Sequence, residues 1–185
     1  MDSGIKILGF AGSLRKGSFN RSLLCAAGEL LPEGVTLETF DLEGIPPFNP
    51  DLEKTPPERV SEFKNRIKAA DAVLIASPEY NYSVPGVLKN AIDCASRPYG
   101  DSAWPGKAVA VMSASTGMLG GSRAQYHLRQ TFLFLGVTAV IRPEVFVTFA
   151  AQKFDESGKL TDEPTREVVK QLVQALADLA RKQKS

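Results

Sequence analysis

Long hydrophobic segments are missing from this chain of 185 residues. No apolar run approaches the roughly 20 residues that a helix needs to cross a bilayer, so we expect no transmembrane segment. Residues 1–4 (Met-Asp-Ser-Gly) are not followed by the long apolar stretch of a signal peptide, so none is expected.

The chain also has only two cysteines and almost no net charge. The two cysteines, Cys25 and Cys94, suit a reducing compartment better than a disulfide framework. The formal net charge of +1 gives no strong field toward nucleic acid or anionic membranes. We therefore expect a cytoplasmic protein with neither kind of partner. The sequence also has no CxxC motif and no metal-ligand cluster, so no metal site is expected.

Short apolar segments alternate with helical patterns along the chain. Strands are predicted at 5–9, 35–41, 72–76, 107–113 and 137–141, with a possible continuation at 145–148 beyond Pro143. Helices are predicted at 18–31, 58–70, 84–95, 123–135 and from 162 or 165 to about 182. The length suits one domain over residues 1–185.

This alternation predicts an α/β fold with helices on both faces of a parallel sheet. Five strands in a chain of this length favour a three-layer, flavodoxin-like sheet with the strand order 2-1-3-4-5. Ligands of such sheets bind beyond the carboxyl ends of the strands, near the point where the strand order reverses. Three loops should meet there: 12–20, 77–83 and 113–121.

The first of these loops has the chemistry of an anion site. It follows an apolar strand and precedes a helix for which Ser18 is the expected N-cap. Helix N-termini present unpaired N–H groups and a positive dipole end. The side chains of Ser13, Arg15 and Asn20 add further donors, and an arginine can bind a phosphate bidentately.

The spacing of this loop excludes two common phosphate motifs. It contains neither Gly-x-x-x-x-Gly-Lys-Ser/Thr nor Gly-x-Gly-x-x-Gly. Asp41 is the nearest candidate for the acidic residue that binds ribose in dinucleotide folds, but it does not clearly have that role. So many side-chain donors suit a terminal monophosphate, whereas the alternative is a simple connection with an exposed arginine.

The second loop offers a stiff edge for a planar group. Pro78, Glu79, Tyr80 and Asn81 follow the third strand, and a second proline comes at Pro85. Main-chain groups and Asn81 could bond the polar atoms of a heterocycle. The alternative interpretation is a capped turn with packed tyrosines.

Three motifs therefore lie in order along the chain. They are Gly12-Ser13-x-Arg15-x-x-Ser18-x-Asn20, Pro78-Glu79-Tyr80-Asn81 and Pro85-Gly86-x-x-Lys89-Asn90-Ala91-Ile92-Asp93. Together they resemble the NAD(P)H-dependent FMN reductase family, most closely its quinone and chromate reductase branch. The resemblance extends over nearly the whole chain.

The resemblance implies FMN as cofactor and NAD(P)H as co-substrate. It implies that the FMN phosphate is held by residues of the first loop, namely Gly12, Ser13, Arg15, Ser18, Phe19 and Asn20. It implies further that the isoalloxazine is bordered by two other sets, namely Pro78, Glu79, Tyr80 and Asn81 on one side and Ser113, Ala114 and Ser115 on the other.

In such an enzyme the cofactor performs the chemistry and no side chain is expected to be catalytic. We expect a ping-pong cycle in which hydride passes from NAD(P)H to flavin N5 and then to an acceptor. Quinones, free flavins, azo compounds and chromate are the candidate acceptors. His127 lies within a helix and is not expected to act as a base, and Cys25 and Cys94 are expected to be small core residues.

The family resemblance also implies an oligomeric state, and two alternative functions stay open. Residues 126–129 and Glu144 resemble positions of subunit contact, which implies a homo-oligomer, either a dimer or a tetramer. The main alternative is a flavodoxin-type electron carrier, but such carriers tend to be strongly acidic, unlike this chain. A flavin-free nucleotide-binding protein of the same fold is a second alternative.

Overall fold

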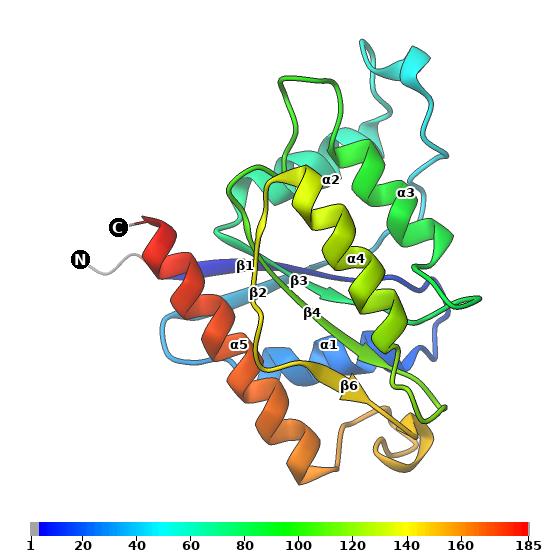
Figure 1. Ribbon diagram of the computed structural model, residues 1–185, viewed down its shortest axis with the longest axis vertical. Coiled ribbons are helices and arrows are strands. Elements are labelled where there is room, and N and C mark those ends of the chain that lie inside the picture. Colours follow the sequence, from blue (N-terminus) through cyan, green and yellow to red (C-terminus); the bar gives the residue numbers. More distant parts are fainter. Residues whose placement is uncertain (1–3, 185) are drawn as a thin grey trace.

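A parallel sheet forms the centre of the computed structural model, which describes residues 4–184 (Figure 1). Its strand order is β2-β1-β3-β4-β5, and β6 pairs with β4 beside this path. All the pairings are parallel, which confirms the predicted flavodoxin-like order. The strands are β1 (Ile5–Ala11), β2 (Val35–Phe40), β3 (Ala72–Ala76), β4 (Ala108–Ala114), β5 (Thr138–Ala139) and β6 (Val145–Val147).

The sheet has one more strand than predicted. The start of β4 pairs with β5, with Val109 opposite Ala139, and its end pairs with β6, with Met112 opposite Val145. Residues 140–144 connect the two short strands and include Pro143. Because proline has no N–H to donate to a sheet, the last strand is interrupted there rather than continuous.

Helices cover both faces of the sheet. They are α1 (Phe19–Glu29), α2 (Glu58–Ala69), α3 (Gly86–Ala95), α4 (Ser122–Leu135) and α5 (Glu163–Lys184), with short 3₁₀ turns η1 (Pro50–Leu52) and η2 (Ala150–Gln152). Alternate residues of the central strands pack against α1 and α5 on one face and against α2, α3 and α4 on the other. Both sides of β3 and β4 are therefore buried, which explains why β3 is entirely apolar and β4 is apolar except for Ser113.

Local signals place most helix ends where the sequence predicts them. Ser18 accepts a hydrogen bond from the Asn20 N–H at 3.3 Å, as expected of an N-cap. Gly136 ends α4 in the left-handed conformation, with φ 66°, which confirms the predicted C-cap. Pro85 immediately precedes α3 and is its N-cap rather than part of its first turn.

One of the two cysteine predictions is wrong. Cys94 is buried, as expected, but Cys25 is exposed. In α1 the core-facing positions belong to Leu23, Leu24, Ala26 and Ala27, and Cys25 falls on the opposite side of the helix. Within residues 4–184, no helix combines the length and the apolar character that crossing a membrane requires.

Candidate cofactor site

The three predicted loops converge at the carboxyl edge of the sheet. The Gly12 N–H donates to the Ala76 carbonyl at 2.8 Å, which joins the end of β1 to the end of β3. The Ser77 N–H donates to the Met112 carbonyl at 2.9 Å and joins β3 to β4 in the same way. The residues that follow these three strands therefore form one continuous surface.

The first loop has the donors of an anion site. The side chains of Ser13 and Ser18 are almost fully buried, and α1 begins directly after Ser18 with no acidic residue in its first turn. A Cβ on Gly12 would approach the Leu88 side chain to 2.9 Å, so any other residue here would require Leu88 to shift. A helix N-terminus free of carboxylates, flanked by hydroxyls, fits a phosphate monoester.

Arg15 is the exposed cation of this loop. Its guanidinium donates to the Gly17 carbonyl and lies 6.0 Å from the centre of the Phe19 ring. The backbone N–H of Arg15 donates to the Ser13 hydroxyl at 3.3 Å. These contacts curl the loop tightly and keep a fixed positive charge beside the start of α1.

Asn20 joins the first loop to the third. Its side-chain amide donates to the Ala114 carbonyl and accepts from the Ala114 N–H, both at 2.9 Å. Both groups are buried. Asn20 therefore fixes the end of β4 against the start of α1, a role that its place in the motif did not reveal.

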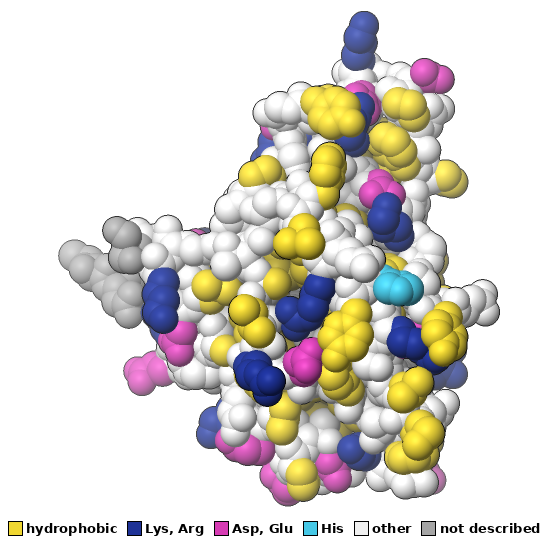
Figure 2. Space-filling view, viewed as in Figure 1, with side chains coloured by type: hydrophobic (Ala, Val, Ile, Leu, Met, Phe, Trp, Pro, Cys, Tyr) yellow, Lys and Arg dark blue, Asp and Glu magenta, His cyan; other side chains and the backbone are white. Residues whose placement is uncertain are grey.

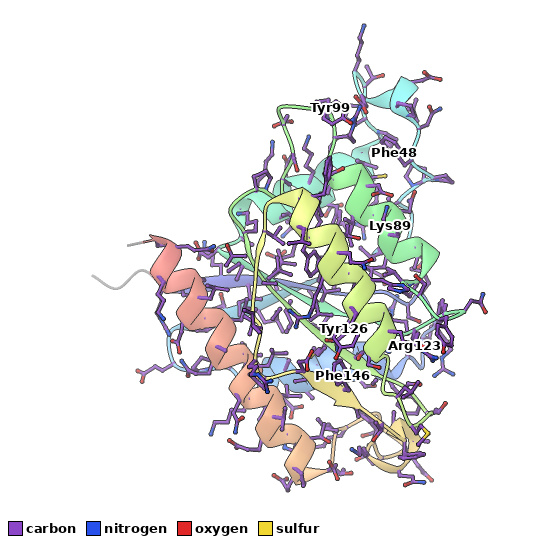
Figure 3. The ribbon with its side chains drawn as sticks, in the orientation of Figure 1. Phe48, Lys89, Tyr99, Arg123, Tyr126 and Phe146 are labelled. Carbon is purple, nitrogen blue, oxygen red and sulfur yellow. The ribbon has the colours of Figure 1, made fainter. Side chains whose placement is uncertain are left out.

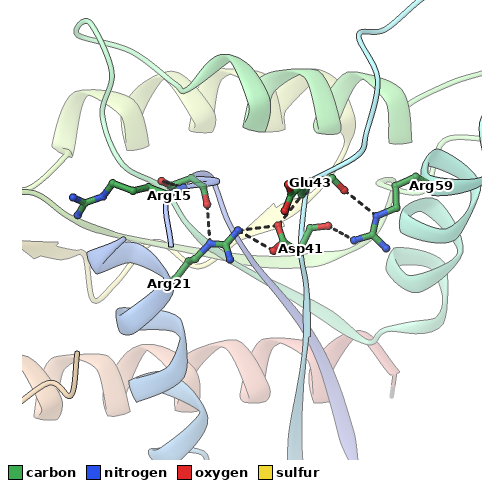
Figure 4. Close-up of polar contacts among 6 residues, drawn as sticks. Arg15, Arg21, Asp41, Glu43 and Arg59 are labelled. Carbon is green, nitrogen blue, oxygen red and sulfur yellow. Dashed lines mark hydrogen bonds and ion pairs between the residues drawn. The ribbon is translucent and has the colours of Figure 1, made fainter. Parts of the chain in front are cut away.

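Arg21 links the backbone of the first loop to Asp41, just after β2 (Figure 4). Its Nε donates to the Ser13 carbonyl at 3.0 Å, and its terminal nitrogen lies 2.9 and 2.8 Å from the two carboxylate oxygens of Asp41. Arg59 donates to the backbone carbonyls of Asp41 and Glu43 on the other side. The ion pair therefore gives Asp41 a structural role in holding Arg21 behind the first loop.

The second loop turns sharply between Tyr80 and Ser83. The backbone N–H of each residue donates to the carbonyl of the other at 3.0 Å. Asn81 and Tyr82 between them have positive φ angles, 47° and 73°. Asparagine adopts this conformation more readily than most residues, which is one structural reason for Asn81 in the motif.

Glu79 anchors this turn to α4. Its carboxylate is 8% exposed, pairs with the Arg123 guanidinium and accepts from the Arg123 N–H at 3.1 Å. The hydrogen bond from the Arg123 side chain to Glu79 raises the pKa of Arg123, which stays charged. The Arg123 guanidinium also lies 3.4 Å from the centre of the Tyr82 ring. Figure 3 shows Arg123 near the first turn of α4.

Two further contacts tie the second loop to its surroundings. The Tyr80 hydroxyl lies 3.2 Å from the Ser13 hydroxyl, which bridges the second loop and the first. His127 Nδ1 lies 2.8 Å from the Ser83 hydroxyl. The single histidine of the chain therefore organises the loop from α4, and Tyr80 and Tyr82 remain 48% and 68% exposed.

The third loop closes on itself through Ser113. The Ser113 hydroxyl donates to the Gly120 carbonyl at 2.5 Å and accepts from the buried Gln125 side chain at 2.7 Å. Gly121 follows with φ 85°, and a Cβ there would approach the Ser113 Cβ to 2.8 Å. The Ser113 side chain is therefore engaged within the loop, whereas Ser115 stands at its outer part.

The comparison with protein families agrees with this geometry. The model of the NADPH-dependent FMN reductases matches residues 5–152, which include all three loops. The chain belongs to this family. The predicted resemblance is confirmed, and with it the enzyme class: this reductase is an oxidoreductase that uses FMN and NAD(P)H.

Individual relatives are similar over almost their full length. An NAD(P)H-dependent FMN reductase of Pseudomonas aeruginosa is 49% identical over 177 residues, 95% of each chain. An NAD(P)H:quinone oxidoreductase of Solanum tuberosum is 48% identical over 187 residues and covers 97% of this chain and 95% of its own. Among solved structures, FerB, a flavoenzyme NAD(P)H:(acceptor) oxidoreductase of Paracoccus denitrificans, has a TM-score of 0.89 at 36% identity over 97% and 98% of the two chains.

Proposed function

We propose that this reductase, acting as a single FMN-binding domain over residues 1–185, reduces quinones with NAD(P)H in a ping-pong cycle. When bound, FMN supplies the ability to accept a hydride from NAD(P)H and to pass two electrons to an acceptor. In the balanced reaction NAD(P)H gives a hydride, solvent gives a proton, and the quinone becomes a hydroquinone. Free flavins, azo compounds and chromate are further acceptors in this proposal.

The observation that carries the proposal is the convergence of three loops with different chemistry. Anion donors lie in the first loop, a stiff edge with exposed tyrosines in the second and a backbone-rich wall in the third. A phosphate and a planar ring on one molecule match this division. The residues proposed to hold the phosphate are Gly12, Ser13, Arg15, Ser18, Phe19 and Asn20, and those proposed to border the ring are Pro78, Glu79, Tyr80, Asn81, Ser113, Ala114 and Ser115.

Within this site the side chains bind and orient. Arg15 and the start of α1 neutralise the phosphate charge, because they offer fixed positive charge and N–H donors. Glu79 is engaged with Arg123 and holds the turn in which Tyr80 and Asn81 lie. His127 is bonded to Ser83 and positions the same turn. These contacts preorganise the ring edge.

Steady-state kinetics test the cycle. Initial rates with varied NADPH and a quinone should give parallel double-reciprocal lines, whereas intersecting lines would exclude the ping-pong order. A panel of quinones, free flavins, an azo dye and chromate, each with NADPH and NADH, ranks the acceptors by kcat/KM.

A flavin spectrum separates this proposal from its alternatives. The purified protein should be yellow or take up FMN, and NADPH should bleach it rapidly. A yellow protein that NADPH does not bleach would be an electron carrier of the flavodoxin type. A colourless protein that takes up no FMN would contradict both readings of the site.

We also propose that the enzyme is a homo-oligomer, a dimer or a tetramer, that uses the outer face of α4. Leu133 and Phe134 at the end of this helix are 85% and 83% exposed, and Ile141 beyond it is 76% exposed. Figure 2 shows hydrophobic side chains along this face. Large apolar side chains gathered on one face are typical of subunit contacts. Sedimentation velocity at micromolar concentration should show an oligomer, and Leu133→Glu together with Phe134→Lys should give monomers.

A cytoplasmic location completes the proposal. Both cysteines are free thiols, which suits a reducing compartment. The supply of NAD(P)H favours the same compartment. Cell fractionation with an antibody against the chain tests it, since recovery from a membrane or extracellular fraction would contradict it.

A further inference from the structure

Three large hydrophobic side chains stand exposed beside the third loop. Met118 and Leu119 belong to the loop and are 72% and 46% exposed, and Phe149, just after β6, is 47% exposed. We call these three residues the apolar rim. Single exposed apolar residues are common on proteins, but these three come from two neighbouring segments at the carboxyl edge of the sheet.

Backbone hydrogen bonds hold the rim against the third loop. The Phe149 N–H donates to the Gly117 carbonyl at 3.3 Å, and the Ala150 N–H donates to the Ser115 carbonyl at 2.9 Å. The Ser115 N–H in turn donates to the Val147 carbonyl at 2.9 Å. Figure 1 shows the segment after β6 lying against the loop after β4. Phe149 is thereby fixed within a few residues of the proposed ring wall.

Phe149 also has an unusual backbone. Its φ of 48° and ψ of 45° place it in the left-handed region, which a bulky aromatic residue rarely adopts. Residues held in this way cluster at ligand sites, where the strain serves the position of a side chain. Here the ring is about half exposed, so core packing does not account for the choice of phenylalanine.

Resting on the proposed function, we propose that the apolar rim binds the apolar part of the electron acceptor. The acceptors favoured by this contact are quinones that carry a fused ring or an alkyl group, in preference to small polar acceptors. Phe149 is then a specificity-determining residue. The redox step is unchanged, since the rim contributes contact area and no proton or electron.

Variants at Phe149 separate the side chain from the backbone strain. In Phe149→Ala the ring is lost and the strain persists, whereas in Phe149→Gly both are removed because glycine adopts positive φ freely. Both variants should lower kcat/KM for 2-methyl-1,4-naphthoquinone about tenfold, the lower end of what an apolar contact gives in specificity. The value for 1,4-benzoquinone should change less than about twofold. Phe149→Leu should keep most of the preference.

Phe48 provides a matched control. It is 38% exposed on the proline-rich segment before α2, and its backbone N–H, not its ring, bonds Asn90. Phe48→Ala therefore removes a ring of similar exposure away from the three loops. It should leave the rates with both quinones unchanged.

A binding measurement provides a readout that does not depend on turnover. Isothermal titration of the FMN-loaded protein with redox-inactive 2-naphthol should show a dissociation constant raised about tenfold by Phe149→Gly and unchanged by Phe48→Ala. If the wild-type protein binds no FMN or does not oxidise NADPH, the proposed function itself fails. If both of those hold and Phe149→Gly affects the two quinones equally, or neither, the inference about the rim is overturned.

Discussion

Two asparagines make the same pair of hydrogen bonds at two different places in the molecule. Asn20 joins α1 to the backbone of Ala114 at the proposed cofactor site. Asn90 joins α3 to the proline-rich segment before α2, accepting from the Phe48 N–H at 2.8 Å and donating to the Pro46 carbonyl at 2.9 Å. The first bridge shapes a wall of the site, and the second secures a surface segment.

The two asparagines make similar hydrogen bonds, but the residues that surround them have different properties. A cavity of about 370 Å³ lies beneath the proline-rich segment, and its charged groups bond one another. Lys64 donates to Asp101 and to the Arg97 carbonyl, and Arg97 pairs with Glu53. At the candidate cofactor site, by contrast, Arg15 is exposed beside the N-terminus of α1. Polar groups that converge on one place, and not a hollow alone, mark a candidate ligand site.

The largest expected effect comes from breaking the bridge at the cofactor site. Asn20→Ala leaves the N–H and carbonyl of Ala114 buried without partners, which should lower the free energy of unfolding by about 2–4 kcal/mol. Urea denaturation measures the loss. Asn90→Ala is the matched control and should cost less, because Asn90 is only half-buried and the Phe48 N–H can bond water. FMN affinity should fall in the first variant and persist in the second.

Arg15 tests the phosphate anchor itself. Because a charge-assisted hydrogen bond contributes about 1.5–3 kcal/mol, Arg15→Ala should raise the dissociation constant of FMN about 10- to 100-fold. Fluorescence quenching of FMN measures this constant. Activity should return when FMN is added in excess, and Lys16→Ala next to it should have a much smaller effect. Activity that stays lost with FMN fully bound would show that Arg15 does more than anchor the phosphate.

Glu79 and Arg123 test how the second loop is held. Glu79→Gln removes the charge of a nearly buried carboxylate while it keeps an acceptor for the N–H groups at the start of α4. The free energy of unfolding should fall by about 1–2 kcal/mol. A double-mutant cycle with Arg123→Gln should show positive coupling between the two side chains. Additive effects of the two substitutions would mean that the pair does not act as a unit.

The smallest expected effect concerns the charged groups beneath the proline-rich segment, and it is revealed by lowering the pH. Hydrogen bonds from Lys64 and Lys68 lower the pKa of Asp101 from 3.8 to about 2. A carboxyl with a lowered folded-state pKa stabilises the protein above pH 3.8, and this stabilisation is lost as the pH falls toward 2. Wild type should therefore melt above Asp101→Asn at pH 7, and the two melting temperatures should converge as the pH falls through about 2. A difference that persists below this pH would assign the effect to packing, and FMN binding at pH 7 should be the same in both.

The order of the elements could be predicted because their signals are local. Apolar strands alternate with amphipathic helices, and Ser18 and Gly136 mark a helix start and a helix end by their own chemistry. The break near Pro143 was foreseen only as a possibility, since the pairing of β6 with the end of β4 depends on residues far away in the chain. Cys25 was misplaced because neighbouring apolar residues in α1 left its side of the helix ambiguous.

The candidate site, like the fold, could be predicted only in part from the sequence. The motifs point to the three loops, because glycine, hydroxyl and proline residues after buried strands are visible in the sequence. The partners of those residues are not visible: Arg21 with Asp41 and Glu79 with Arg123 are 20 and 44 residues apart. Phe149 escaped notice for another reason, since nothing in its local sequence signals a positive φ.

The interrupted edge of the sheet has a consequence for motion. The outer side of β4 is covered by two residues of β5 and three of β6, whereas β3 is flanked along its whole length. Short edge pairings open at lower cost than central ones. The amides of Ser115 and Ala150 should therefore exchange with deuterium before those of β3. We therefore expect one wall of the candidate site to open locally while the central strands stay folded.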